Sequence, residues 1–101
     1  MLHAEILPYV NDFSGLPRTT QLVRENGIRS FLLHLHALEE MPEHKVNGAI
    51  TVQVLQGSVL FVAADEKREL STGSLISLPP AVPHSLYARA ASLMLITAVT
   101  P

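Results

Sequence analysis

Histidine is the residue type in this sequence best suited to chemistry, because the chain has five histidines and no cysteine. His34 and His36 are one residue apart, and side chains alternate across a β-strand, so both imidazoles would share one strand face. That spacing suits a transition metal. It also suits a pair of partly exposed strand histidines, which is the interpretation we favour. Phe31, Leu33 and Leu35 make the other face apolar, and the sequence alone does not say which face turns inward.

Several function classes find no support in the sequence. A G-x-S-x-G elbow, a P-loop and a dinucleotide fingerprint are all absent. Seven basic and nine acidic residues give a net charge of −2, without the basic stripe that a nucleic-acid partner requires. The first residues lack the basic and apolar regions of a signal peptide, and no run approaches the roughly 18 apolar residues of a membrane span. We therefore expect a cytoplasmic protein that binds neither nucleic acid nor membrane.

Short apolar runs, separated by turn residues, predict the elements that must position the histidines. Asn26-Gly27 is a strong hairpin signal, and Gln56-Gly57 predicts a second tight hairpin. Proline-rich residues 79–83 predict a stiff bend. Many short strands at this spacing favour an all-β sandwich or barrel with little or no helix. The expected strands are residues 19–24, 28–38, 49–55, 58–63, 68–70, 74–78, 84–88 and 92–99.

A chain of 101 residues is long enough for one domain and too short for two, so we expect residues 1–101 to form a single domain. Residues 1–18 read as an irregular lead-in with one candidate strand at 5–10, in the barrel or against a neighbouring subunit. Residues 28–99 would form the barrel core. The chain is 48% hydrophobic and only 16% charged, and this apolar excess leads us to expect a homodimer.

Residues 73–84 resemble the second sequence motif of the cupin family, G-D-x4-P-x-G-x2-H-x3-N. Gly73, Pro79 and His84 match it at the right spacing. Three other motif positions hold different residues, namely Ser74, Ala81 and Ala88.

An upstream stretch resembles the first cupin motif, G-x5-H-x-H-x3,4-E-x6-G. His44 and Gly57 match, whereas Val46 occupies the second histidine position and Ile50 occupies the glutamate position. The two motifs occur in order, and together the resemblance covers about residues 28–99.

The resemblance implies a double-stranded β-helix, or jelly-roll, barrel that is often dimeric and open at one end. In the family, the motif histidines and glutamate hold a divalent metal such as iron, manganese, nickel, copper or zinc. Here two of the four ligand positions are aliphatic. Any metal would rest on His44 and His84 and would be weakly held unless His34 and His36 join them.

The resemblance also implies a pocket lined by His44, His84, Val46 and Ile50. Tyr87 is a further candidate at the pocket mouth, although a packing role is the alternative that we favour for it. An apolar pocket with a few polar groups is an ordinary ligand site.

Two functional hypotheses follow. The first is a small cupin that binds a small molecule in the barrel, with or without a weakly held divalent metal. The second is a metal-dependent enzyme of dioxygenase or isomerase type acting on a small organic substrate. The sequence identifies no catalytic residue, and we lean to the first hypothesis.

Overall fold

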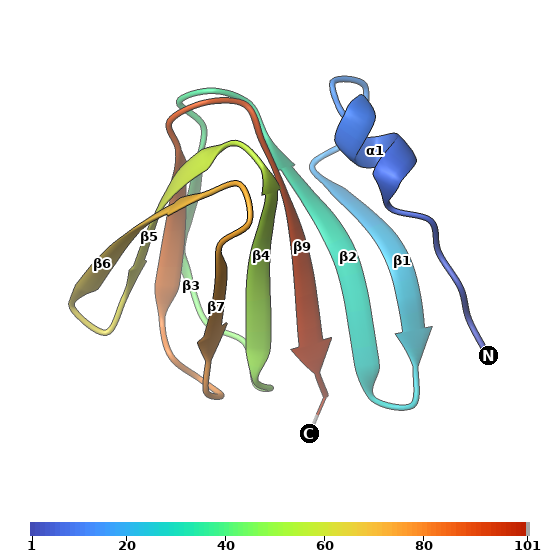
Figure 1. Cartoon of the computed structure of the whole chain (residues 1–101). Helices are drawn as coiled ribbons and strands as arrows, with labels where there is room; N and C mark the ends of the chain where they lie inside the picture. Colours follow the sequence, from blue (N-terminus) through green and yellow to red (C-terminus); the bar gives the residue numbers. More distant parts are fainter. Residues whose placement is uncertain (101) are drawn as a thin grey trace.

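A computed structural model describes residues 1–100 of the chain and confirms the all-β class (Figure 1). One short helix, α1 (Leu7–Asn11), precedes the strands. The strands are β1 (Thr19–Glu25), β2 (Ile28–Leu35), β3 (Glu40–His44), β4 (Ile50–Gln56), β5 (Ser58–Ala63), β6 (Glu66–Ser71), β7 (Leu75–Leu78), β8 (His84–Ala88) and β9 (Ser92–Val99).

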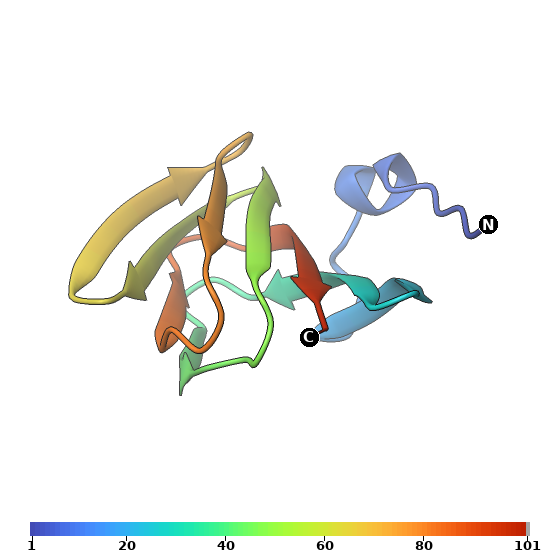
Figure 2. The ribbon, with the colours of Figure 1, turned by 90° about the horizontal axis from the view of Figure 1, so that it is seen from below.

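The strands form two antiparallel sheets that face each other, as expected for the jelly-roll barrel. The five-stranded sheet has the order β1-β2-β9-β4-β7, and the four-stranded sheet has the order β3-β8-β5-β6. In Figure 2, β1 and β2 extend to one side of the four-stranded sheet. This overhang leaves part of the inner face of β1 and β2 without a strand opposite it.

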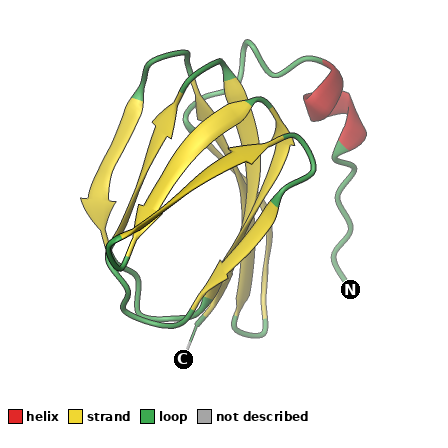
Figure 3. Cartoon of the chain, turned by 60° about the vertical axis from the view of Figure 1, so that its left-hand side comes forward, coloured by secondary structure: helices red, strands yellow, loops and turns green. Residues whose placement is uncertain are grey.

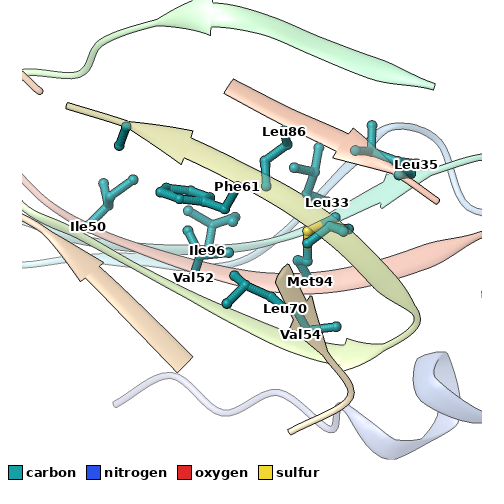
Figure 4. Close-up of a cluster of buried hydrophobic side chains, with 13 residues drawn as sticks. Leu33, Leu35, Ile50, Val52, Val54, Phe61, Leu70, Leu86, Met94 and Ile96 are labelled. Atoms are coloured by element: carbon teal, nitrogen blue, oxygen red, sulfur yellow. The ribbon is translucent and has the colours of Figure 1, made fainter. Parts of the chain in front are cut away.

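The core lies between the sheets and is built by alternation along each strand. In β4, Ile50, Val52 and Val54 are buried, whereas the intervening residues are only partly covered. This alternation is the signature of a strand with one face in the core. Figure 4 shows these side chains meeting their counterparts from the other strands. Those counterparts include Leu33, Leu35, Phe61, Leu86, Met94 and Ile96.

The hairpin predicted at Asn26-Gly27 is confirmed. Both residues have positive φ, 53° and 79° respectively, as the tight two-residue turn between paired strands requires. The turn joins β1 to β2, whose residues Arg24 and Arg29 lie directly opposite each other.

The second predicted hairpin, at Gln56-Gly57, is wrong. The strands on either side of it belong to different sheets, so this segment is a corner at which the chain crosses from one sheet to the other. Gly57 has a φ of 119°, which an L side chain rarely adopts. Gly57 therefore marks a sharp change of direction between the sheets and not the predicted hairpin.

The lead-in contains a helix where the sequence suggested a strand at residues 5–10. Pro8 lies at the start of α1, a position where its missing N–H costs nothing. Figure 3 shows this segment running alongside the barrel, outside the strands.

The prediction also missed β3, which has no buried residue and so lacks the apolar alternation that marks a strand. Within residues 1–100, no helix is long and apolar enough to cross a membrane.

Candidate functional site

His44 and His84 lie side by side on the neighbouring strands β3 and β8. β3 and β8 are antiparallel neighbours, and their register pairs these two residues directly. The ring centroids are 4.4 Å apart with the planes tilted by 57°. His84 is only 4% exposed and stacks on Phe61, with a centroid distance of 5.8 Å. His44 is exposed at the rim.

Backbone carbonyls fix the proton position on both imidazoles. The Nδ1 atom of His44 lies 3.0 Å from the Pro42 carbonyl oxygen, and that of His84 lies 2.9 Å from the Val82 oxygen. Because a carbonyl can only accept, each Nδ1 must carry the hydrogen and donate it. In the neutral ring, Nε2 is then left with its lone pair. When both rings are neutral, the pair therefore offers two hydrogen-bond acceptors from adjacent strands.

The environment keeps His84 neutral. Burial lowers the pKa of His84 below its usual 6.5, and the neighbouring His44 lowers it further, against the opposing effect of the bond to Val82. A buried imidazolium would lose its hydration and face a second imidazole, so the neutral form is favoured. At neutral pH the His84 Nε2 is thus an acceptor.

The histidine pair opens onto a cavity of about 260 Å³ between the two sheets. Aliphatic and thioether side chains form most of its wall, among them Leu33, Met41, Val46, Ile50, Val52 and Ile96. The polar lining consists of the two histidines, Thr19 and Arg29. Val46 and Ile50 therefore lie on the cavity together with both motif histidines. Such a site, apolar with a few convergent polar groups, is typical of small-molecule pockets.

Tyr87 does not line this cavity. In β8 every second residue is buried, beginning with His84, so Tyr87 lies on the other face of the strand. There it pairs with Glu40 across the sheet, and the guanidinium of Arg89 lies 5.9 Å from its ring centroid. The structure gives Tyr87 this packing position and not one at the pocket mouth.

Neither His34, in β2, nor His36, just after β2, lines the cavity. Phe31 and Leu33 line the cavity, so the alternate residues lie on the opposite face of the strand. On that face His36 is exposed, but His34 is only 3% exposed, so the expectation of partly exposed histidines is wrong for His34. There the Nδ1 of His34 lies 2.9 Å from the Leu16 carbonyl oxygen, and its ring meets the edge of Phe13 at 5.3 Å. The suggestion that His34 and His36 could join His44 and His84 around a metal is therefore wrong.

The donor set does not fit the metal centre of the family. Within the described part of the chain, no group of three or more His, Asp or Glu side chains is placed to hold a metal ion. The two remaining family positions, Val46 and Ile50, place aliphatic groups on the cavity. Two imidazoles are fewer than the three or four protein ligands of most transition-metal sites.

Residues 27–93 match the family model described as the AraC-like ligand binding domain. The chain belongs to this family of cupins. No curated protein has a sequence that matches this cupin domain. The fold, the matched family model and the two motif histidines thus all indicate a cupin domain.

Solved structures show the same fold. A conserved protein of unknown function from Streptococcus pyogenes is 28% identical, with a TM-score of 0.76 over 82% of this chain and 73% of that one. A cupin-2 domain protein from Shewanella frigidimarina is 15% identical, with a TM-score of 0.79 over 95% and 93%. Salicylate 1,2-dioxygenase from Pseudoaminobacter salicylatoxidans, in complex with gentisate, is 25% identical with a TM-score of 0.70. That match covers 72% of this cupin domain and only 20% of the dioxygenase.

Sequence reasoning missed Arg29 and Thr19 as cavity residues. A signal was present for Arg29, because it has the same strand parity as Phe31 and Leu33. It could be used only once those residues were known to face inward. Thr19 lies opposite Leu33 in the register of β1 and β2 and carries no signal of its own.

Proposed function

We propose that this cupin domain binds a small organic molecule in the barrel cavity, and that His44 and His84 act there as hydrogen-bonding groups. The observation that carries the proposal is the fixed histidine pair on an otherwise largely apolar cavity. Each Nδ1 is held by a backbone carbonyl, so each Nε2 is available to a ligand hydroxyl or N–H. Binding of this kind needs no resident metal.

The alternative, a metal-dependent dioxygenase or isomerase, has less support. It requires three or four ligands with open coordination positions, and the cavity offers two imidazoles beside aliphatic Val46 and Ile50. The likeness to salicylate 1,2-dioxygenase covers a fifth of that chain. For this reason we include salicylate and gentisate among the first compounds to be tested, and infer no more from the likeness.

Nuclear magnetic resonance of 15N-labelled protein in the presence of EDTA tests the proposal. We expect small aromatic and aliphatic fragments to shift the amide signals of Val46, Ile50 and His84. His84→Ala should abolish these shifts. His36→Ala is the matched control, because this histidine lies on the outer face, and it should leave them unchanged.

Two results would contradict the proposal. One is the absence of any fragment that shifts cavity signals at millimolar concentration. The other is binding that appears only after a divalent metal is added, since the two imidazoles would then act as metal ligands.

A further inference from the structure

We propose that the ligand of this cavity is an organic anion, most simply a carboxylate, and that Arg29 binds its charged group. This inference rests on the proposed function, since it names the class of molecule that the cavity would hold. It depends on where Arg29 lies, on the charges near it and on the chemistry of the cavity wall.

Arg29 lies where the cavity meets a second hollow on the surface. It lines the 260 Å³ cavity and also an outer hollow of about 550 Å³ at the β1–β2 turn. Val46 and Ala98 line both spaces as well. The guanidinium carbon is 4.9 Å from the ring centroid of Phe31, which itself lines the cavity. Arg29 thus presents a planar cation between bulk water and the apolar interior.

No carboxylate of the described chain forms an ion pair with Arg29. The ion pairs that arginines make within residues 1–100 belong to Arg18, Arg68 and Arg89, and no Asp or Glu lines the cavity. Glu25 lines the outer hollow but not the cavity, and it makes no ion pair with Arg24 or Arg29. The cavity therefore carries a positive charge at its edge without a negative charge to balance it.

A second arginine strengthens this charge. Arg24 lies directly opposite Arg29 across β1 and β2 and lines the same outer hollow. Like charges directly opposite in a sheet destabilise it. An anion bound at this position would relieve that repulsion and gain from both charges.

The rest of the site limits what the anion can be. The guanidinium of Arg29 can bind a carboxylate through two parallel hydrogen bonds. The body of the ligand would lie against Leu33, Ile96 and the ring of Phe31, which suits an aromatic or aliphatic group. A hydroxyl or N–H at the far end could donate to His84 Nε2. A cation would be repelled at Arg29, and a polyol would find few partners along the aliphatic wall.

Benzoate and benzamide are the probes that test this inference, because they share size and shape and differ in charge. Binding is measured by 15N nuclear magnetic resonance titration in EDTA. We expect benzoate to bind at least about tenfold more tightly than benzamide, as hydrogen bonds to charged groups predict. In Arg29→Met, benzoate should bind no better than benzamide.

Arg24→Met is the matched control, since it removes the same charge from the neighbouring strand without changing the cavity wall. It should weaken benzoate binding by less than about threefold, as expected for an exposed charge that makes no direct contact. An equal loss in both arginine variants would overturn direct binding by Arg29, because it would show that only the general positive potential matters.

The remaining outcomes separate this inference from the function on which it rests. If benzamide binds as tightly as benzoate and Arg29→Met has no effect, the anion proposal fails and the ligand-binding function stands. If neither probe shifts cavity signals while other, neutral fragments do, the anion proposal again fails and the ligand-binding function again stands. If no fragment of any charge binds, both proposals fail.

Discussion

The Cα of Gly57 lies against Ser92, so closely that a Cβ on Gly57 would meet the Ser92 Cα at 2.7 Å. Ser92 is fully buried, and its hydroxyl accepts a hydrogen bond from the Ser58 N–H at 3.1 Å and donates to the Ala90 oxygen at 2.8 Å. The corner between the two sheets therefore leaves no space for a side chain. This corner carries the chain from β4 in one sheet to β5 in the other.

Gly57→Ala is expected to destabilise the protein by about 3–5 kcal/mol, through positive-φ strain together with steric overlap. Gly57→Val, with a larger side chain, should prevent folding. Gly73→Ala is the matched control, because Gly73 also has positive φ, 94°, but has nothing within 4 Å of the added Cβ. It should cost only about 1–2 kcal/mol. Chemical denaturation measures both, and equal losses would contradict the close contact with Ser92.

Stability should fall as the pH drops through the range in which unfolded histidines become protonated. The folded-state pKa of His84 is lowered by burial below its usual 6.5, so the unfolded chain takes up this proton first. The contribution of His84 is complete above about pH 6.5 and decreases as the pH falls toward the lower folded-state pKa. His84→Asn keeps a donor for the Val82 carbonyl and removes the titration. Denaturation at about pH 7.5 and about pH 5.5 should show a smaller pH dependence in this variant, and an unchanged dependence would refute the assignment.

Removal of one arginine from the Arg24–Arg29 pair should stabilise the ligand-free protein slightly. Both side chains are exposed, so we expect Arg24→Gln to gain only about 0.2–0.5 kcal/mol. The gain should disappear near 1 M salt, where charges are screened within a few ångströms. Arg68→Gln, which breaks an ion pair with Glu66, should give no gain. Thermal unfolding at low and high salt distinguishes these cases, and a salt-independent gain would mean that charge repulsion is not its cause.

The two aliphatic family positions should accept a metal site if the missing ligands are restored. Val46→His combined with Ile50→Glu adds an imidazole and a carboxylate to the cavity that already holds His44 and His84. We expect this double variant to bind about one Zn²⁺ or Co²⁺ per chain, as four-ligand sites do, and to be stabilised by the metal. The same pair in a His84→Ala background should bind more weakly. If the double variant binds no more metal than wild type, the four positions do not converge.

Most of the fold could be predicted from the sequence because its signals are local. Alternation in Ile50, Val52 and Val54 reports burial of one strand face, and Asn26-Gly27 reports a hairpin through its backbone preference. The motif spacing also identified His44 and His84 as residues of one site. The structure places them directly opposite each other on β3 and β8. The motif spacing indicates a shared site but not this strand pairing.

The parts that could not be predicted depend on how strands are placed in three dimensions. The histidine face of β2 turns outward because Phe31, Leu33 and Leu35 face the other sheet, and a single strand pattern fits either orientation. The crossing at Gly57 looks like a hairpin until the sheets are assigned. Arg29 is a cavity residue because it lies on the same strand face as Phe31 and Leu33.

The homodimer and the single-domain organisation remain predictions. Leu75 and Val99 are more than half exposed, at 66% and 51%, which agrees with the apolar excess of the composition. We expect a dimer in sedimentation at micromolar concentration. A clean monomer would show that the composition argument is wrong.

The central claim is that His44 and His84 serve a ligand cavity without a resident metal. Mass-spectrometric metal analysis of untagged protein, purified without chelators beside the His84→Ala variant, tests it most directly. We expect far less than one transition metal per chain in both proteins. About one metal per chain in wild type, lost in His84→Ala, would contradict the claim and make the two imidazoles ligands of a metal centre.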